Sequence, residues 1–393
     1  MFELDAQDRQ ALAAFLQDMV RIPSESTQEK AMAERLAAEM TRVGFRDVRL
    51  DRIGNVVGRI GPGSGRVLLY NGHMDTVGVG DPATWRHDPF GAEIVDGVMH
   101  GRGTSDMKGA LAAMVYGAKM LVDRGVSLNG ELYLAGAVQE EPCEGLGMQV
   151  LMEKEGLQVD AVVLGEATDL QVARGQRGRL EIEVTVRGRS CHASAPQRGV
   201  NAIYGAARLL FGLEMLSGQL AEDRFLGQGT LAVTQIRNTG GSRNAVPDSC
   251  TFLIDRRLTL GETETKALAE IQGVLLREDV DATISVPDYT ATSFTGYKAR
   301  ARAYYAPWAL DRDDPLVQQV SKAVRTELGY RPTVGKWAFS TDGVYTMGVA
   351  GIPTVGFGPG EEQYAHTADE QIRLSDVYRA AQVYARIATE VLA

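Results

Sequence analysis

The spacing of apolar residues predicts alternating strands and helices over the first 176 residues. Short apolar runs, typical of buried strands, are followed by segments in which apolar residues recur at helical spacing. The expected strands lie at 55–60, 66–72, 131–141 and 160–167, and the expected helices at 31–45, 106–125 and 147–156, after a first helix marked by Leu12, Phe15, Leu16 and Met19. This alternation predicts an α/β sheet covered by helices on both faces.

The pattern changes near Arg177 and changes back near Tyr305. "RLEIEVTVRG" alternates apolar and polar residues, as a strand with one face in solvent does. Further strands are expected at 229–238, 249–258 and 282–289, with helices at 201–216 and 265–276. Helices (314–329, 375–392) and a buried strand (351–360) then return. We therefore predict a discontinuous main domain of residues 1–176 and 306–393, with a smaller α+β domain inserted at 177–305.

The composition indicates which class of protein this is and which partners it is not expected to bind. The 393 residues are 44% hydrophobic and 23% charged, with no long apolar span, as in a soluble globular protein. The net charge of −10 argues against a nucleic-acid or anionic-membrane partner. Three cysteines without zinc-finger spacing exclude a disulfide framework. The N-terminal segment has no basic region before its apolar residues, so we expect a helix and a cytoplasmic location.

Ionisable residues gather where predicted buried strands or glycine-rich turns end. "VLLYNGHMDTV", "LAGAVQEEPCEG", "VVLGEATD", "GRGTSDMKGA" and "EEQYAHTADE" contain, in this order, His73 with Asp75, Glu140 with Glu141, Glu166, Asp106 and His366. Ligands of open α/β sheets bind outside the carboxyl ends of the strands. These side chains are therefore expected to meet in one cleft.

So many acidic groups in one cleft would repel each other unless cations lay between them. Each motif alone has an ordinary explanation: Asp106 as a helix N-cap, Glu140 and Glu141 as a solvated turn, Glu166 as a loop cap. Their shared position at strand ends favours a metal site instead. Histidine with carboxylates and no thiolate suits Zn²⁺, Co²⁺ or Mn²⁺.

Six motifs together resemble the acetylornithine deacetylase / succinyl-diaminopimelate desuccinylase family of metallopeptidases. They are "NGHMDTV", "GRGTSDMKGALAAM", "QEEPCEG", "GEATD", "RGRSCHASAP" and "YAHTADEQI", in the family's order and nearly from end to end. The family also includes carboxypeptidases, di- and tripeptidases and aminoacylases. The resemblance implies a zinc-exopeptidase-like catalytic domain, with a mixed central sheet covered by helices, and an inserted α+β domain that serves as lid and dimerisation unit.

The resemblance also implies a site for two divalent ions, with Zn²⁺ expected first and Co²⁺ or Mn²⁺ as alternatives. His73, Asp106 and Glu166 would hold one ion. Asp106, Glu141 and His366 would hold the other, so that Asp106 bridges the pair. Asp75 would accept the second ring N–H of His73 and fix its tautomer. The peptide bond between Asp106 and Met107 would be cis.

The remaining roles are implied in the same way. Glu140 would be the general base for a metal-bridging water. His192 would stabilise the oxyanion, from the same subunit or from a dimer partner, and Arg257 would pair with a substrate carboxylate. The expected further substrate contacts are Asn244, Ser340 and Gly358.

The expected function is metal-dependent hydrolysis of an amide bond in an N-acyl amino acid or a short peptide with a free carboxylate. "FSTDGVYT" and "GFGPGEEQYAHT" favour the deacylase branch. A dipeptidase or aminopeptidase of the same family is the first alternative. A non-catalytic metal- or ligand-binding homologue is the second, and the presence of every expected ligand argues against it. We expect a homodimer formed through the inserted domain.

Overall fold

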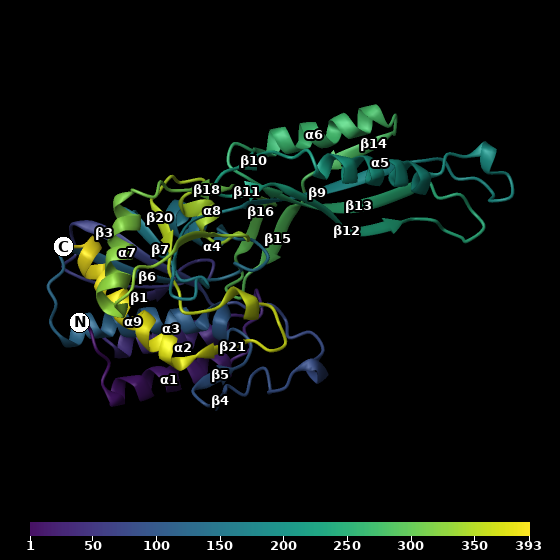
Figure 1. Cartoon of the computed structure of the whole chain (residues 1–393). Helices are drawn as coiled ribbons and strands as arrows, with labels where there is room; N and C mark the ends of the chain where they lie inside the picture. Colours follow the sequence, from purple (N-terminus) through teal and green to yellow (C-terminus); the bar gives the residue numbers. More distant parts are fainter.

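The computed structural model describes residues 1–393 and contains a helix-covered body from which an elongated second unit projects (Figure 1). The body is built on a nine-stranded sheet in the order β1-β2-β6-β3-β7-β20-β8-β18, with β19 also paired to β8. The bounds are β1 (Arg46–Leu50), β2 (Val56–Ile60), β3 (Arg66–His73), β6 (Gly130–Ala137), β7 (Ala161–Leu164), β8 (Val172–Gln176), β18 (Trp308–Ala309), β19 (Val334–Trp337) and β20 (Thr354–Gly356).

The sheet is mixed, and its central strands are parallel. β3 pairs in parallel with both β6 and β7, and β20 pairs in parallel with β7. β2 is antiparallel to β6 at one side, and β18 is antiparallel to β8 at the other. The carboxyl ends of β6, β3 and β7 therefore lie side by side at one edge of the sheet.

Both faces of this sheet are covered. Leu68 and Tyr70 of β3 lie in the larger apolar core beneath the long helices, whereas Leu69 between them belongs to a second core on the opposite face. The long helices are α1 (Ala6–Val20), α2 (Lys30–Arg42), α3 (Gly109–Asp123), α7 (Pro315–Leu328) and α9 (Leu374–Val391). The short helices α4 (Leu146–Gln149) and α8 (Gly343–Thr346) pack together. The predicted α/β fold, a central sheet between helices, is confirmed.

Helix starts follow the sequence signals. The Asp5 side chain accepts the backbone N–H of Asp8 at the start of α1, and Asp314 does the same for Leu316 before the N-terminal proline of α7. The predicted apolar stripe of α1 is buried. No helix is at once long enough and apolar enough to span a membrane.

The projecting unit holds a second, antiparallel sheet in the order β12-β13-β9-β14, with β17 also paired to β9. Its elements are β9 (Gly178–Arg187), α5 (Ala202–Ser217), β12 (Thr230–Asn238), β13 (Ser249–Leu258), α6 (Glu264–Arg277), β14 (Ala282–Ser285) and β17 (Tyr304–Tyr305). Alternate residues of β9 are buried, as its pattern predicts. The chain leaves the nine-stranded sheet after Gln176 and rejoins it at Trp308.

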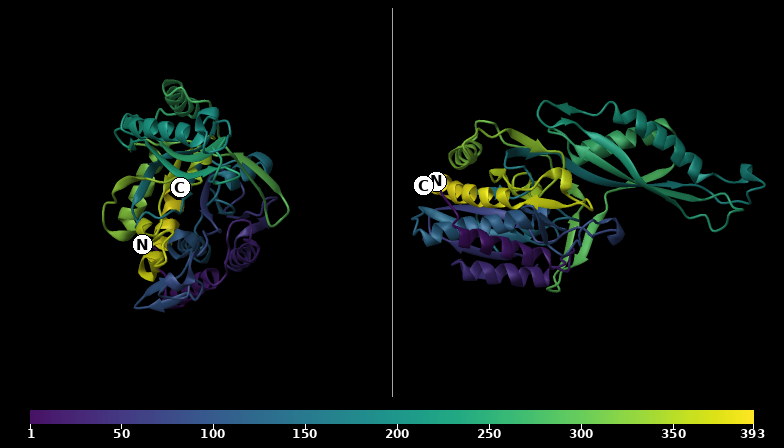
Figure 2. Two further views of the ribbon diagram at one scale, coloured as in Figure 1. Left: turned by 90° about the vertical axis from the view of Figure 1, so that its right-hand side faces the viewer. Right: turned by 60° about the horizontal axis from the view of Figure 1, so that its bottom comes forward.

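Three smaller sheets complete the fold. They are β21-β5-β4, β10-β11 and the ribbon β15-β16, formed by β4 (Glu93–Val95), β5 (Val98–His100), β10 (Glu222–Asp223), β11 (Gly227–Gln228), β15 (Asp288–Thr292), β16 (Lys298–Arg302) and β21 (Gln371–Arg373). The ribbon descends from the projecting unit alongside the body (Figure 2). It was not expected from the sequence, which predicted only a strand at 282–289 in this region.

Candidate metal centre

The strand ends of the central sheet bring the predicted ligands together. β3 ends at His73, which lies opposite Ala137 of β6. Two residues after Ala137 a turn begins that carries Glu140 and Glu141, and Glu166 lies two residues beyond the end of β7. Because β6, β3 and β7 are parallel neighbours, these side chains emerge at the same edge.

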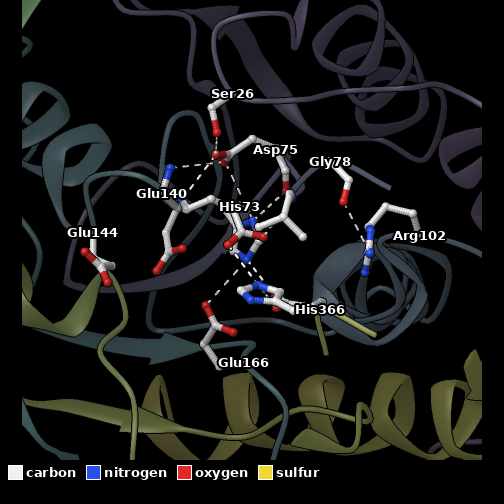
Figure 3. A network of polar contacts seen from close by, with 12 residues as sticks. Ser26, His73, Asp75, Gly78, Arg102, Glu140, Glu144, Glu166 and His366 are labelled. Carbon is white, nitrogen blue, oxygen red and sulfur yellow. Dashed lines mark hydrogen bonds and ion pairs between the residues drawn. The ribbon is translucent and has the colours of Figure 1, made fainter. Parts of the chain in front are cut away.

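Two overlapping groups of nitrogen and oxygen donors form there. In each group, one ligand atom per residue lies within 4.8 Å of the others. The first group is His73, Asp106 and Glu166, and the second is Asp106, Glu141 and His366. Figure 3 shows His73, Glu166 and His366 converging, with Glu140 beside them. The five predicted ligands are thus brought together as two sites that share Asp106.

Asp106 faces both histidines with different oxygens. Its Oδ1 lies 3.0 Å from His73 Nε2, and its Oδ2 lies 3.2 Å from His366 Nε2. Glu166 Oε1 is 3.7 Å from His73 Nε2, and Glu141 Oε2 is 3.0 Å from His366 Nε2. A carboxylate with one oxygen directed into each donor group has the geometry of a bridging ligand.

The backbone around Asp106 is fixed by a residue that sequence reasoning missed. The backbone N–H groups of Ser105 and Asp106 donate to Glu370 Oε1 at 3.0 and 3.1 Å. Arg102 Nη1 lies 2.7 Å from Glu370 Oε2, and both side chains are buried. The only signal for Glu370 was its place four residues after His366. The peptide bond from Asp106 to Met107 is cis, as the resemblance implied.

Burial and mutual charge shift the pKa values of the carboxyl and imidazole groups in this site. Burial raises the pKa of Glu166 to about 8, although His73 opposes this, and the charges of Asp106 and Glu141 raise it further. Hydrogen bonds to Asp106 and Glu141 raise the pKa of His366 to about 10. Burial alone would raise the pKa of Asp106, but hydrogen bonds from His366 and His73 lower it below its ordinary value. Without cations, protons must compensate the carboxylates.

The donor set fits divalent cations. Each group offers one imidazole nitrogen and two carboxylates, with no thiolate, which suits Zn²⁺, Co²⁺ or Mn²⁺. Cations would replace the protons that the two histidines otherwise retain, because metal ligands bind in deprotonated form. The residues present therefore fit two metal ions.

Asp75 makes contacts that differ from those expected. His73 Nδ1 hydrogen bonds with the backbone carbonyl oxygen of Asp75 at 2.8 Å, whereas the Asp75 carboxylate oxygen is 3.7 Å away. That carboxylate accepts the Ser26 hydroxyl at 2.7 Å and the backbone N–H groups of Glu140 and Glu141 at 3.1 and 3.2 Å. Because β3 ends at His73, Asp75 lies beyond the strand and turns toward these donors.

Glu140 is buried and lines a cavity of about 430 Å³ at the metal centre. Burial raises its pKa well above the ordinary value; His73 opposes the shift, while Glu166 adds to it. The cavity lining also includes Arg257 and Ser340, both predicted as substrate contacts. Arg257 is held by Asp255, with nitrogen–oxygen distances of 2.8 and 3.1 Å, and Ser340 donates to Glu144 at 2.6 Å.

The sequence did not single out Glu144 and Arg179, which also line the cavity. Arg179 Nη2 lies 2.8 Å from Glu144 Oε2 and so ties β9 of the projecting unit to the body. Arg179 also lies directly opposite Arg257 in the β9–β13 pairing. The acidic turn "EEPCEG" was the only sequence signal for Glu144, and Arg179 had none.

Besides Asp75, three residues predicted as catalytic or substrate-binding do not line the cavity. His192 and Asn244 are exposed and lie in two loops that meet, through pairing of His192 with Ala245, at the far end of the projecting unit (Figure 1). Gly358 instead packs under the Glu166 segment, where a β-carbon would approach the Glu166 carbonyl oxygen to 2.4 Å. Gly358 therefore supports a predicted metal ligand rather than facing a substrate.

Comparisons with known proteins show which proteins this chain is similar to. The family model described as "Peptidase family M20/M25/M40" matches residues 69–390. "Uncharacterized protein YgeY" of Escherichia coli (strain K12) is 44% identical over 99% of this chain and 96% of its own length. "Succinyl-diaminopimelate desuccinylase 2" of Ruegeria sp. (strain TM1040) is 30% identical over 94% of this chain and 92% of its own. The structure of the M20 family metallo-carboxypeptidase Sso-CP2 from Sulfolobus solfataricus superposes with a TM-score of 0.77 at 20% identity, covering 98% of this chain and 99% of its own.

Proposed function

Because the chain belongs to peptidase family M20/M25/M40, we propose that this metallohydrolase cleaves the amide bond of an N-acyl amino acid or a short peptide with a free carboxylate. The observation that carries the proposal is the position of Asp106. Its two oxygens face two donor groups, and the buried Glu140 lines the same cavity. This arrangement suits hydrolysis of a carbonyl compound rather than simple storage of a cation.

Each ion has a proposed set of holders. His73, Asp106 and Glu166 would hold one, and Asp106, Glu141 and His366 the other, with Zn²⁺ as the first candidate and Co²⁺ or Mn²⁺ as alternatives. Bound there, the two ions would supply Lewis-acid chemistry, by polarising the amide carbonyl and lowering the pKa of water.

Glu140 is the proposed general base. As a buried carboxylate in the wall of the cavity, it would take a proton from the attacking water and return that proton to the leaving amine nitrogen. Its backbone N–H is held by Asp75, so the base occupies a fixed place beside the ligands. In this step the protein supplies one carboxylate, that of Glu140, held where it can accept and return the proton.

Arg257 is the proposed carboxylate contact, with Ser340 beside it in the cavity wall. The guanidinium can pair with both oxygens of a carboxylate, as it does with Asp255 in this structure. N-acyl amino acids and dipeptides both offer such a carboxylate. Arg257 therefore supports binding of any substrate with a free carboxylate. It does not distinguish a deacylase from a dipeptidase, and the substrate panel below makes that distinction.

His192 and Asn244 would act on a second copy of the chain. They lie at the far end of the projecting unit and do not line the cavity of their own chain. We propose that residues 177–305 form a lid and dimerisation domain that places His192 of one subunit at the oxyanion of its partner. The sequence left open whether His192 acts in its own subunit or in a partner, and its distance from the cavity of its own chain supports the partner.

The surface of this domain supports self-association. On α5, Tyr204 and Phe211 are 69% and 67% exposed, and Ile236 of the edge strand β12 is 55% exposed. An uncovered edge strand beside apolar side chains is typical of a surface that pairs with another chain.

The three cysteines are free, which suits the cytoplasm as the proposed compartment.

A substrate panel tests the proposal. Metal-stripped protein is restored with Zn²⁺, Co²⁺ or Mn²⁺ and assayed with N-acetyl, N-formyl and N-succinyl amino acids, and with dipeptides. Turnover of one class that requires metal and is lost in Glu140→Ala supports the proposal and decides between deacylase and peptidase. Metal binding without turnover of any amide would support a non-catalytic homologue.

A further inference from the structure

The β15–β16 ribbon fastens the inserted domain to the body at two places. It leaves the inserted sheet after β14 and returns to it at β17. Between these points it runs beside the body in both views of Figure 2. The ribbon is thus an arm of the inserted domain that reaches the other domain.

The tip of the ribbon rests on the turn between β1 and β2. Thr295 Oγ1 donates to the Arg52 carbonyl oxygen at 2.6 Å. The Phe294 ring fills the space beside Gly54, where a β-carbon would approach the ring to 2.5 Å, and Gly54 has a φ of +114°. Glycine at this position allows both the left-handed backbone and the close approach of the ring.

The second contact is made by Tyr289, with the residue that precedes Glu140. The Tyr289 hydroxyl donates to Gln139 Oε1 at 3.0 Å. Gln139 is fully buried, has a left-handed φ of 57° and directly precedes Glu140. Its Nε2 has no hydrogen-bond partner, so the Tyr289 hydroxyl makes the only hydrogen bond of this amide side chain.

The turn that carries Glu140 is therefore held from three directions. Glu29 accepts the Gln139 backbone N–H at 3.1 Å, and Asp75 accepts the N–H groups of the next two residues. Both carboxylates belong to the body. Of these three side chains, Tyr289 is the one from the inserted domain, which also reaches the later part of the turn through Tyr305 and the Pro142 carbonyl oxygen at 3.3 Å. Without the Tyr289 hydroxyl, the buried side-chain amide of Gln139 would have no hydrogen-bond partner.

We infer that Tyr289 is a positioning residue for Glu140, because its hydrogen bond to Gln139 holds the residue directly before Glu140. The position of the proposed general base therefore depends on the inserted domain. The inference rests on the proposed role of Glu140. Tyr289 is not among the residues that line the cavity, so it has no contact with substrate there. Its effect is therefore on kcat and not on KM.

Tyr289→Phe removes the hydroxyl and keeps the ring. Tyr297→Phe is the matched control, because Tyr297 lies on the same ribbon and its hydroxyl makes no hydrogen bond within the chain. With the substrate that wild type turns over, kcat of Tyr289→Phe should fall about fivefold, the factor for one hydrogen bond, while KM changes less than about twofold. Tyr297→Phe should match wild type. Equal kcat in all three proteins would overturn the inference.

A double-mutant cycle with Gln139→Met separates positioning from general loosening. If Tyr289 acts through Gln139, the double variant should lose no more kcat than the larger single effect. Additive losses would show that Tyr289 acts elsewhere.

Hydrogen–deuterium exchange provides a readout that needs no substrate. The peptide containing residues 138–141 should exchange faster in Tyr289→Phe than in wild type, and at the wild-type rate in Tyr297→Phe. The three proteins are compared at equal metal content. Unchanged exchange in both would contradict the inference even if wild type turned over no substrate. Absence of turnover in wild type with faster exchange in Tyr289→Phe would instead count against the proposed function alone.

Discussion

The carboxylate of Asp75 accepts the backbone N–H of Glu140 at 3.1 Å. This contact connects the end of one central strand to the turn that follows its neighbour. It assigns Asp75 a task other than that expected from its place two residues after His73, whose ring is held by the Asp75 backbone carbonyl. The carboxylate positions the proposed base, and the carbonyl orients the proposed ligand.

Asp75→Asn should therefore damage turnover more than metal binding. The amide offers one acceptor oxygen where the carboxylate oxygens accept three donors, so the turn at Glu140 loosens, while the backbone contact to His73 remains. We expect kcat to fall about ten- to a hundredfold, the range for charged hydrogen bonds, with metal content unchanged. Ser26→Ala, which removes one of the three donors, should lose only a few-fold. Loss of metal with normal kcat per bound metal would contradict this account.

Glu370→Gln should destabilise the folded chain through Arg102. The substitution retains an acceptor for the Asp106 backbone but leaves the buried Arg102 guanidinium without its charged partner. A cost of about 3–5 kcal/mol in the free energy of unfolding is expected, measured by denaturant titration. Replacing Arg102 by Met in the same protein should recover part of this loss. A double variant no more stable than Glu370→Gln would argue against the ion pair as the cause.

Glu29 should make stability depend on pH. Burial, with the nearby charge of Asp75, raises its pKa to about 7 from 4.5. The folded state thus binds this proton more tightly, so the resulting stability is complete below pH 4.5 and is lost as the pH rises through about 7. Glu29→Gln keeps a carbonyl oxygen for the Gln139 N–H and removes the titration.

Relative to wild type, Glu29→Gln should therefore gain stability by up to about 3 kcal/mol between pH 4.5 and pH 8. The measurement is denaturant unfolding of metal-free protein across this range, with the exposed Glu25→Gln as control. Parallel curves for Glu29→Gln and wild type would show that Glu29 ionises normally.

Arg257→Met should weaken recognition of the substrate carboxylate. Arg257 lines the cavity, and its removal takes away a charged hydrogen-bonding group. We expect KM to rise about ten- to a hundredfold for carboxylate substrates. The preference of wild type for a carboxylate over its carboxamide analogue should disappear. Arg300→Met, at an exposed position of the ribbon, provides the control. Retained preference in Arg257→Met would assign carboxylate recognition to another residue.

The strand pattern predicted that these ionisable side chains share one cleft, because parallel strands end at one edge, and the family resemblance implied which five are ligands. A polar residue after an apolar run is visible without a structure, and His73, Glu141 and Glu166 all have that signal. The direction of a side chain beyond the strand end is not visible in this way. The contacts of Asp75 depend on where the strand stops and on which backbone donors lie near it.

Contacts between segments far apart in the sequence also could not be predicted from the sequence. Arg179 meets Glu144 across the two domains, and Tyr289 meets Gln139 across 150 positions. The ribbon strand "KARAR" alternates basic residues with alanine, which is depleted in strands, so its pattern did not mark it as a strand. The partners in such contacts are fixed by the packing of the whole chain.

The central claim is that Asp106 bridges two metal ions, and metal stoichiometry tests it most directly. Purified chain is loaded with Zn²⁺, dialysed and analysed by mass spectrometry of the metal content, beside His366→Ala. We predict two ions per chain in wild type and one in His366→Ala, because His73, Asp106 and Glu166 remain as one complete donor group. One ion or none in wild type, or two in His366→Ala, would contradict the account.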